Sequence, residues 1–159
     1  MLEPSLATFG AGCFWGVEEL FRKLPGVIDT SVGYMGGTTD QPSYESVCTD
    51  ATGHAEVVQV AYDPKRVSYE DLLRVFLENH NPTTPNRQGP DIGSQYRSVI
   101  FYHSPEQQKL AQESLEALRR KRAFEHPIVT QIVPVTTFWK AEEYHQKYLF
   151  KQGKTHCSI

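Results

Sequence analysis

The amino-acid sequence predicts one α/β domain whose sheet is mixed or antiparallel. The chain has 159 residues, and about 100–200 residues are enough for a single domain with its own core. Helical and strand patterns alternate in the approximate order β-α-β-β-α-β-α-β-α, and only some strand pairs have a helix between them. This order favours a split βαβ arrangement over a doubly wound parallel sheet.

The first part of the chain predicts a strand, a helix and a second strand. Residues 5–9 are apolar, and the glycines that follow end this run. Apolar side chains then recur at spacings of three and four, which is typical of an amphipathic helix that ends at Pro25: Phe14, Val17, Phe21 and Leu24. Residues 27–34 alternate in polarity, which predicts a strand.

Two further helices are predicted from their N-terminal signals. Ser68 and Asp71 have the spacing of a capping box, in which each side chain bonds the other's backbone. Ser104 precedes Pro105, and proline is favoured at the first helical position. This region therefore predicts, in order, strand 54–62, helix 69–79, strand 97–102 and helix 105–122.

The remaining predictions concern a long loop and the C-terminal elements. Residues 80–97 contain Pro, Gly, Asn and Gln and little that is apolar, and long loops in compact domains are usually functional. Residues 128–135 predict a strand, which Pro134 places at an edge or an end of the sheet. Residues from Ala141 to about Leu149 predict a last short helix.

The composition excludes several classes of protein. Lys and Arg number 16 and Asp and Glu 19, so the net charge is −3, which is not that of a nucleic-acid binder. No uncharged stretch approaches the roughly 18 apolar residues of a transmembrane helix. The start, Met1-Leu2-Glu3-Pro4, has an early acid and no basic region, unlike a signal peptide. We therefore expect a cytoplasmic protein that binds neither nucleic acid nor membranes.

Three cysteines are present: Cys13, Cys48 and Cys157. They are too few, and odd in number, for a secreted disulfide framework. They form no CxxC pair, and the scattered histidines lack metal-ligand spacing, so no metal site is predicted.

Cys13 has the strongest signal for a reactive thiol, because it follows Gly10-Ala11-Gly12 and opens the first helix. Unpaired N–H groups and a partial positive charge at a helix start favour a thiolate and lower a cysteine pKa. Phe14 and Trp15 point about 100° apart, so one can face the core while the other stands beside the sulfur. There they could wall a pocket for a methyl or thioether group. The alternative for Cys13 is a buried cysteine that packs as a small hydrophobic residue, and the alternative for Phe14 and Trp15 is that both are ordinary core residues.

Glu56 is the candidate proton donor. Period two places it on the same strand face as Val58, Val60 and Tyr62, where burial raises a carboxyl pKa toward neutrality. The alternative is a strand end at which the carboxyl reaches water. Three loop residues are weaker candidates: the phenols Tyr44 and Tyr96 and the acid Asp91.

Several segments together resemble the A-type peptide methionine sulfoxide reductases, over about residues 6–150. They are Gly12-Cys13-Phe14-Trp15-Gly16, Gly33-Tyr34-Met35-Gly36-Gly37, Pro42-Ser43-Tyr44, Gly53-His54-Ala55-Glu56, the loop from Arg87-Gln88-Gly89 through Asp91 to Ser98, and Phe138-Trp139 with Ala141-Glu142 and His145-Gln146. The resemblance implies a two-layer α/β plait with a ferredoxin-like core and long peripheral loops, with residues 1–159 as one catalytic domain.

The resemblance also implies the reaction and the role of each residue. The family reduces the S epimer of methionine sulfoxide, free or in proteins, without a metal or organic cofactor. On this basis Cys13 is the nucleophile, and Phe14 with Trp15 holds the substrate methyl. Glu56 donates a proton to the sulfoxide oxygen. The remaining roles fall to Tyr44 and Tyr96, which hydrogen-bond that oxygen, and to Asp91, which supports the loop side.

Recycling is expected to need a second thiol. The resemblance makes Cys157, on a mobile tail at residues 151–159, the residue that resolves the Cys13 sulfenic acid as a disulfide. An external dithiol such as thioredoxin would reduce that disulfide, and the enzyme is expected to be a monomer. Cys48 is expected to be a bystander, with a substitute resolving role as the alternative. The chain departs from the family at Pro90, where an asparagine is usual, and this leaves the placement of Asp91 open.

Two other functions remain open on the residues alone. A thiol peroxidase also needs an activated cysteine and a resolving thiol, but has no need of an aromatic pair or a carboxylic acid donor. A non-enzymatic module that binds methyl or thioether groups would keep its function when Cys13 is replaced by serine. A Cys-His dyad for acyl transfer is a weaker idea, because no sequence signal ties a histidine to Cys13.

Overall fold

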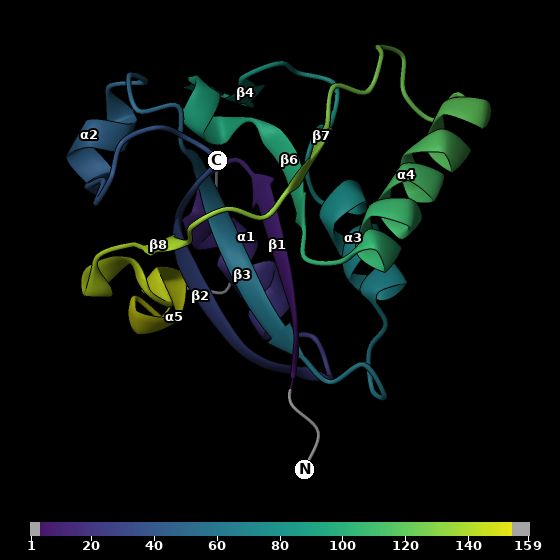
Figure 1. Cartoon of the computed structure of the whole chain (residues 1–159), viewed down its shortest axis with the longest axis horizontal. Helices are drawn as coiled ribbons and strands as arrows, with labels where there is room; N and C mark the ends of the chain where they lie inside the picture. The colour runs from purple at the N-terminus through teal and green to yellow at the C-terminus, as the bar shows by residue number, and fades with distance from the viewer. Residues whose placement is uncertain (1–3, 154–159) are drawn as a thin grey trace.

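A computed structural model describes residues 4–153. Within this range six strands form one sheet in the order β7-β6-β1-β3-β2-β8 (Figure 1). The strands are β1 (Ser5–Ala11), β2 (Val27–Met35), β3 (Ala55–Tyr62), β6 (Ser98–Tyr102), β7 (Gln131–Pro134) and β8 (Trp139–Lys140). Neighbouring strands are antiparallel except β6 and β7, which are parallel. The prediction of a mixed α/β protein is confirmed.

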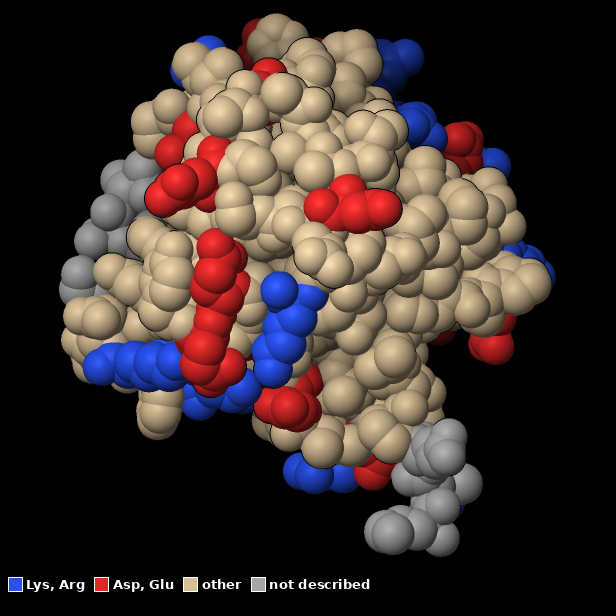
Figure 2. Space-filling view, turned by 60° about the vertical axis from the view of Figure 1, so that its left-hand side comes forward, with Lys and Arg blue, Asp and Glu red and all other residues tan. Residues whose placement is uncertain are grey.

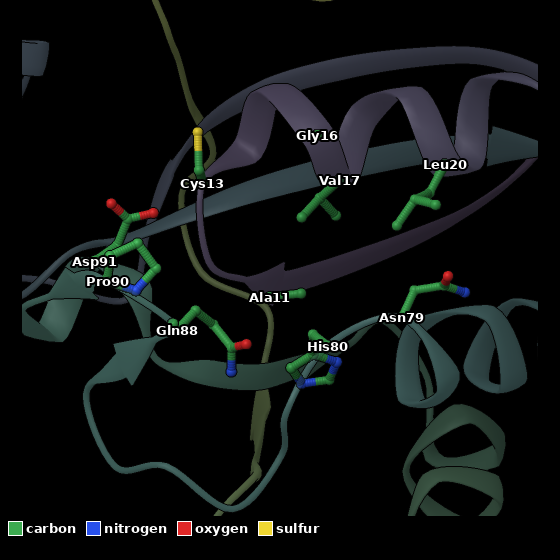
Figure 3. A pocket seen from close by; sticks show the side chains of 11 residues that line it. Ala11, Cys13, Gly16, Val17, Leu20, Asn79, His80, Gln88, Pro90 and Asp91 are labelled. Atoms are coloured by element: carbon green, nitrogen blue, oxygen red, sulfur yellow. The ribbon is translucent and has the colours of Figure 1, made fainter. Parts of the chain in front are cut away.

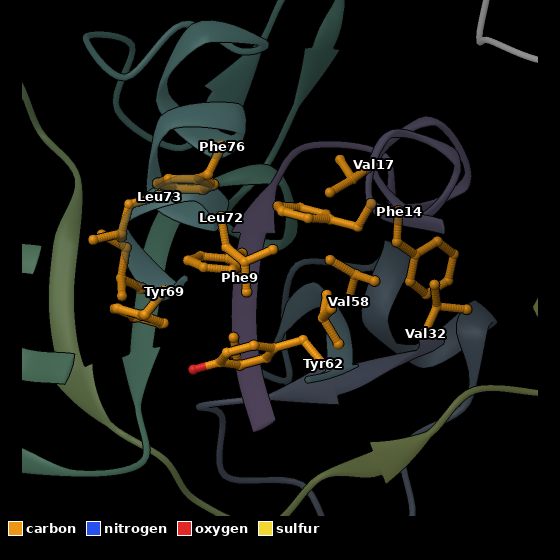
Figure 4. Close-up of a cluster of buried hydrophobic side chains, with 14 of the residues drawn as sticks. Phe9, Phe14, Val17, Val32, Val58, Tyr62, Tyr69, Leu72, Leu73 and Phe76 are labelled. Atoms are coloured by element: carbon orange, nitrogen blue, oxygen red, sulfur yellow. The ribbon is translucent and has the colours of Figure 1, made fainter. Parts of the chain in front are cut away.

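Helices cover one face of the sheet. They are α1 (Phe14–Arg22), α3 (Tyr69–Glu78) and α4 (Pro105–Arg120). Ser68 and Ser104 accept N-cap hydrogen bonds at α3 and α4, as the sequence predicts. The core under the helices contains Phe9 of β1, whose ring stacks on Phe21 and Phe76 at centroid distances of 5.2 and 5.0 Å (Figure 4).

The opposite face has its own apolar cluster. Its buried members are Met35, Ala55, Val57, Val99 and Phe101. The segment from β7 to β8 crosses this face (Figure 1), where Val133, Val135 and Phe138 pack against the cluster. Since both faces are covered, strand β3 is buried along most of its length, and a polar side chain on it is removed from water.

The structure corrects the predictions for the loops. A short helix, α2 (Tyr44–Cys48), was predicted as loop; Ser43 and Ser46 cap it with a capping box. The long loop 80–97 contains a two-stranded hairpin, β4 (Arg87–Gln88) with β5 (Asp91–Ile92), and a 3₁₀ turn, η1 (Ser94–Tyr96). Such short pairs leave almost no hydrophobic periodicity to read.

The helix predicted from Ala141 to Leu149 is wrong. The chain forms a 3₁₀ turn, η2 (Glu143–His145), and then α5 (Tyr148–Lys151), separated at Lys147, whose φ is +53°. Lys151 is the last residue of α5, so the prediction of a mobile tail is wrong at this residue. Residues 154–159 of the predicted tail, which include Cys157, lie outside the described residues.

No helix in the described part of the chain has the length and apolar character needed to cross a membrane. On the face shown in Figure 2, Lys and Arg are interleaved with Asp and Glu and form no continuous basic patch.

Candidate active site

Cys13 caps the N-terminus of α1. Its backbone has φ −55° and ψ 119°, and its side chain makes no capping hydrogen bond to the helix. Gly12 before it has a φ of +99°, and a Cβ at this position would lie 2.8 Å from the Gln88 side chain. The turn into α1 therefore needs glycine, and it places the half-buried thiol at the positive end of the helix dipole.

Glu56 lies on β3 directly under that helix start. One carboxyl oxygen, Oε1, accepts the backbone N–H of Phe14 at 3.2 Å. The other, Oε2, is buried and has no hydrogen-bond partner among the described residues. The residue is 1% exposed, and this burial, reinforced by the charge of Asp91, raises its pKa to about 8. The predicted desolvation of Glu56 is confirmed, and the raised pKa favours a protonated carboxyl near neutral pH.

Two phenols from separate segments of the chain lie near Glu56 and interact with it electrostatically. Tyr44 is the first residue of α2 and Tyr96 the last of η1, and both are half-buried. Burial raises the pKa of each phenol; the charges of Glu56 and Asp91 raise that of Tyr96 further. Both phenols therefore keep their protons at neutral pH and can donate hydrogen bonds.

Asp91 lies at the same opening in spite of Pro90. The β4–β5 hairpin pairs Gln88 with Asp91, and Gly89-Pro90 forms its two-residue loop. A proline in that loop removes no N–H that the pairing needs. Figure 3 shows the Asp91 carboxyl on the Cys13 side of a cavity of about 340 Å³ that both residues line.

The two aromatic residues after Cys13 divide their roles. Phe14 is 1% exposed and packs in the core, whereas Trp15 is only partly buried. Phe14 faces the core, as expected of one of the two residues, and Trp15 also packs against the partly buried edge of that core cluster. The indole of Trp15 stacks on Tyr148 at a centroid distance of 4.0 Å and faces Tyr44 at 6.5 Å. An aromatic wall thus stands beside the helix start.

The C-terminal segment holds this wall in place, and the sequence interpretation gave its residues no role. His145 is fully buried, and its Nδ1 accepts the Trp15 Nε1–H at 2.8 Å. Glu142 accepts the Tyr34 hydroxyl at 2.9 Å and the backbone N–H of Tyr44 at 3.0 Å. The sequence signal for these roles was the motif Ala141-Glu142 with His145-Gln146. In the structure Glu142 and His145 hydrogen-bond the residues that form the site.

Cys48, which was expected to be a bystander, interacts with two residues of the site, Tyr44 and Glu56. It is exposed at the end of α2, shares a side-chain hydrogen bond with Tyr44 and interacts electrostatically with Glu56. Burial of its thiol, partial though it is, raises the Cys48 pKa. Cys13 and Cys48 are both thiols, not joined in a disulfide. Cys157, the predicted resolving residue, lies outside the described range.

No metal site is found in residues 4–153: they contain no group of three or more His, Cys, Asp or Glu side chains that could hold an ion. The arrangement instead offers a thiol at a helix start, a buried acid, two phenols and an aromatic wall. These groups can attack a soft electrophilic atom while a proton is delivered to an oxygen bound to it.

Comparison with known proteins agrees with this chemistry. Residues 5–159 match the family model described as peptide methionine sulfoxide reductase. The chain is 63% identical over 151 residues to a peptide methionine sulfoxide reductase MsrA of Methanoculleus marisnigri, covering 95% of this chain and 92% of the relative.

Solved structures share the fold. That of reduced Mxr1 from Saccharomyces cerevisiae is similar with a TM-score of 0.89 and 40% identity, covering 98% of this chain and 92% of the other. Mxr1 in complex with Trx2 is similar with a TM-score of 0.64 and 29% identity, covering 92% and 85%.

Proposed function

The chain belongs to the peptide methionine sulfoxide reductase family and is an enzyme that reduces methionine sulfoxide, and from this premise we propose that Cys13 is the nucleophile and Glu56 the proton donor. One observation carries the assignment. Glu56 is held by one oxygen on the first N–H of the helix that Cys13 caps, while its second oxygen is buried with no partner among the described residues. The Glu56 carboxyl and the Cys13 thiol are thus both positioned by the first turn of α1.

The first step needs a proton before the sulfur can be attacked. With a pKa raised to about 8 by burial, the protonated form of Glu56 predominates at pH 7. The proton goes to the sulfoxide oxygen, which Tyr44 and Tyr96 also hydrogen-bond. The Cys13 thiolate attacks the sulfur of the protonated sulfoxide and forms an S–S bond. The hydroxyl then passes to the Cys13 sulfur as the substrate S–O bond and the S–S bond break, so that methionine leaves, reduced by two electrons, and Cys13 is oxidised to a sulfenic acid.

The aromatic residues supply the orientation. Phe14 and the His145-held indole of Trp15 are proposed to take the substrate methyl, because an apolar methyl is best removed from water against aromatic faces. With the oxygen fixed by Glu56 and the methyl fixed by the indole, only one hand of the sulfoxide presents its sulfur to Cys13. We propose that this is the S epimer. Asp91, at the rim, would contact the rest of the substrate.

The second half-reaction restores the thiol. A resolving cysteine condenses with the Cys13 sulfenic acid, forming a disulfide and releasing water, and an external dithiol then reduces the disulfide. We propose Cys157 as the resolving residue and a thioredoxin as the reductant; a yeast relative of this chain has been solved in complex with Trx2. These steps balance with protein groups and a dithiol alone, which supports a reaction without an organic cofactor or metal.

Further proposals concern the whole chain. The antiparallel order β6-β1-β3-β2, with α1 and α3 on one face, supports a ferredoxin-like plait as the core. One continuous sheet supports a single catalytic domain. A monomeric state, a cytoplasmic location and action on both free and protein-bound substrate stay predictions, which sedimentation, cell fractionation and substrate assays would test.

The decisive experiment compares the two resolved epimers of methionine sulfoxide with dithiothreitol as reductant. Wild type should reduce the S epimer only, and Cys13→Ser should reduce neither. Reduction of the R epimer alone, or activity that survives the substitution, would overturn the assignment. Turnover of hydrogen peroxide without sulfoxide turnover would instead favour a thiol peroxidase.

A further inference from the structure

A groove leads away from Cys13 along the first helix. Its cavity of about 340 Å³ is lined at one end by Cys13 and Asp91. Val17 and Leu20 of α1 line its side, and Figure 3 shows both side chains pointing from the helix across the cavity toward Ala11, His80 and Asn79. The groove is therefore continuous with the catalytic thiol and bordered by four elements, the end of β1, α1, the end of α3 and the β4–β5 hairpin.

The proposed catalytic groups leave this groove unused. Glu56, Tyr44, Tyr96 and Trp15 do not line it, so reduction of the sulfoxide itself needs no part of it beyond Cys13 and Asp91. Leu20 is only half-buried and does not belong to either core cluster of the described residues. Core packing therefore does not explain why position 20 has an apolar side chain.

The length of the groove matches a stretch of polypeptide. Leu20 follows Cys13 by seven residues, which along a helix is about 10 Å. An extended chain covers that distance with about three residues. The walls are largely apolar, and the ring nitrogens of His80 are both engaged, by the Phe76 carbonyl and the Ser98 hydroxyl, in an imidazole whose pKa is lowered to about 4 by burial. The groove therefore offers no cation to a charged ligand at neutral pH.

We propose that this groove binds the polypeptide beside methionine sulfoxide and takes an apolar side chain within three residues of it. The proposal rests on the function assigned to Cys13 and deepens it: the substrate class becomes protein segments in which an oxidised methionine has apolar neighbours.

The test uses acetylated heptapeptides with S-methionine sulfoxide at the centre and glycine elsewhere, with Leu or Asp placed one to three residues to either side. Dithiothreitol is the reductant. We expect wild type to reduce the best leucine peptide with a kcat/KM about ten-fold above that of its aspartate counterpart, an effect within the range for burial of one leucine side chain. Leu20→Gln should reduce this ratio to below about three-fold, while turnover of free S-methionine sulfoxide is unchanged.

The matched control is Ile28→Gln, which removes an exposed aliphatic side chain away from the groove, near the start of strand β2. It should keep the wild-type ratio. A second variant guards against misfolding of Leu20→Gln. Asn79→Asp adds a charge to the exposed rim of the groove, and it should lower kcat/KM for aspartate peptides about three-fold relative to lysine peptides.

Three results would overturn the proposal. One is a wild type without a preference for apolar neighbours; another is a preference that Leu20→Gln retains. The third is a Leu20→Gln variant whose peptide ratios are unchanged but whose KM for thioredoxin rises, since the groove would then belong to the reductant. Failure of wild type on the free S epimer and on every heptapeptide would overturn the proposed function itself, and with it the groove; turnover of either substrate separates the two cases.

Discussion

The two oxygens of one carboxyl group account for much of the proposed chemistry. Glu56 is fixed through Oε1 by a backbone N–H, which lowers its pKa somewhat, but burial outweighs this and the pKa lies near 8. The sequence could predict this, because period two along β3 put Glu56 on an apolar face. It could not predict the Phe14 contact, which depends on how α1 and β3, 42 positions apart, meet in the fold.

The pH profile of the reductase step should report Glu56. Because the protonated carboxyl is the active form, the single-turnover rate of methionine formation should fall as pH rises through about 8. Glu56→Gln should lower that rate by about 10²–10⁴-fold and remove the inflection. Stopped-flow measurement from pH 6 to 9.5 checks this, with Glu116→Gln as a surface control. An unchanged inflection in Glu56→Gln would show that another group supplies the proton.

The same shift predicts how stability depends on pH. The folded pKa, about 8, is above the ordinary value of 4.5, so the folded chain binds the proton more tightly. This contribution to stability is fully present below about pH 4.5 and is lost as pH rises to about 8, at up to roughly 1.4 kcal/mol per pH unit. Urea unfolding at pH 5, 7 and 8.5 should show a slope that Glu56→Gln reduces. Equal slopes in both proteins would refute the shift.

A second side chain, His145, acts at a distance from the sulfur. Its Nδ1 accepts the Trp15 indole N–H, so Nε2 carries the proton, and that nitrogen has no partner among the described residues. His145→Phe keeps an aromatic ring in the fully buried site but leaves the indole N–H without its acceptor. We expect unfolding free energy to fall by about 1–3 kcal/mol and KM for methionine sulfoxide to rise.

The control for this prediction is alkylation of Cys13. Because the hydrogen bond that His145 makes holds the Trp15 indole, its loss should act on that ring, and the rate at which Cys13 reacts with iodoacetamide should stay within about two-fold of wild type. A His145→Phe variant in which Cys13 alkylation is lost and the KM for methionine sulfoxide rises would indicate a collapsed site. A variant in which neither the KM nor the unfolding free energy changes would show that the indole needs no acceptor.

Elements with strong periodicity were predictable, and those held by side-chain hydrogen bonds were not. Helices α3 and α4 begin at the predicted caps because Ser68 and Ser104 signal them locally. The region from Ala141 to Leu149 also has a helical pattern, but Gln146 bonds the backbone of Val32 on strand β2. Glu18 likewise accepts the backbone N–H of Lys147 at 2.6 Å. Tertiary contacts of this kind override local propensity.

The turn into α1 gives a prediction about the element that presents the thiol. Gly12→Ala places a methyl 2.8 Å from the Gln88 side chain at a φ of +99°. We expect a loss of unfolding free energy of about 1–3 kcal/mol and slower alkylation of Cys13, because α1 and the hairpin must separate. Gly153→Ala is the matched control: its φ is +72°, but nothing lies within 4 Å of the added Cβ. Equal effects on Cys13 alkylation in both variants would exclude the hairpin contact.

Across the whole chain, the residues of the site come from segments that are each short and recognisable, which is why the resemblance could name them. Their convergence depends on the sheet: β1 delivers Cys13, β3 delivers Glu56, and the connections after β2 and before β6 deliver the two tyrosines. What local sequence could not provide is the groove beside Cys13, since its walls come from β1 and α1 and from two distant parts of the chain, the end of α3 and the β4–β5 hairpin.

The division of labour between the remaining thiols is the last prediction. Cys48 lies at the site, but burial raises its pKa, so at neutral pH it is a poorer source of thiolate for condensing with a sulfenic acid. With thioredoxin as the only reductant, Cys48→Ser should therefore turn over within about two-fold of wild type. Cys157→Ser should release about one equivalent of methionine per enzyme and then stop, because the sulfenic acid has no partner thiol. Dithiothreitol should restore turnover to that variant by reducing the sulfenic acid directly. Multiple turnover by Cys157→Ser with thioredoxin, lost only when Cys48 is also replaced, would instead make Cys48 the resolving residue, and mass spectrometry of the oxidised Cys157→Ser enzyme would then show a Cys13–Cys48 disulfide.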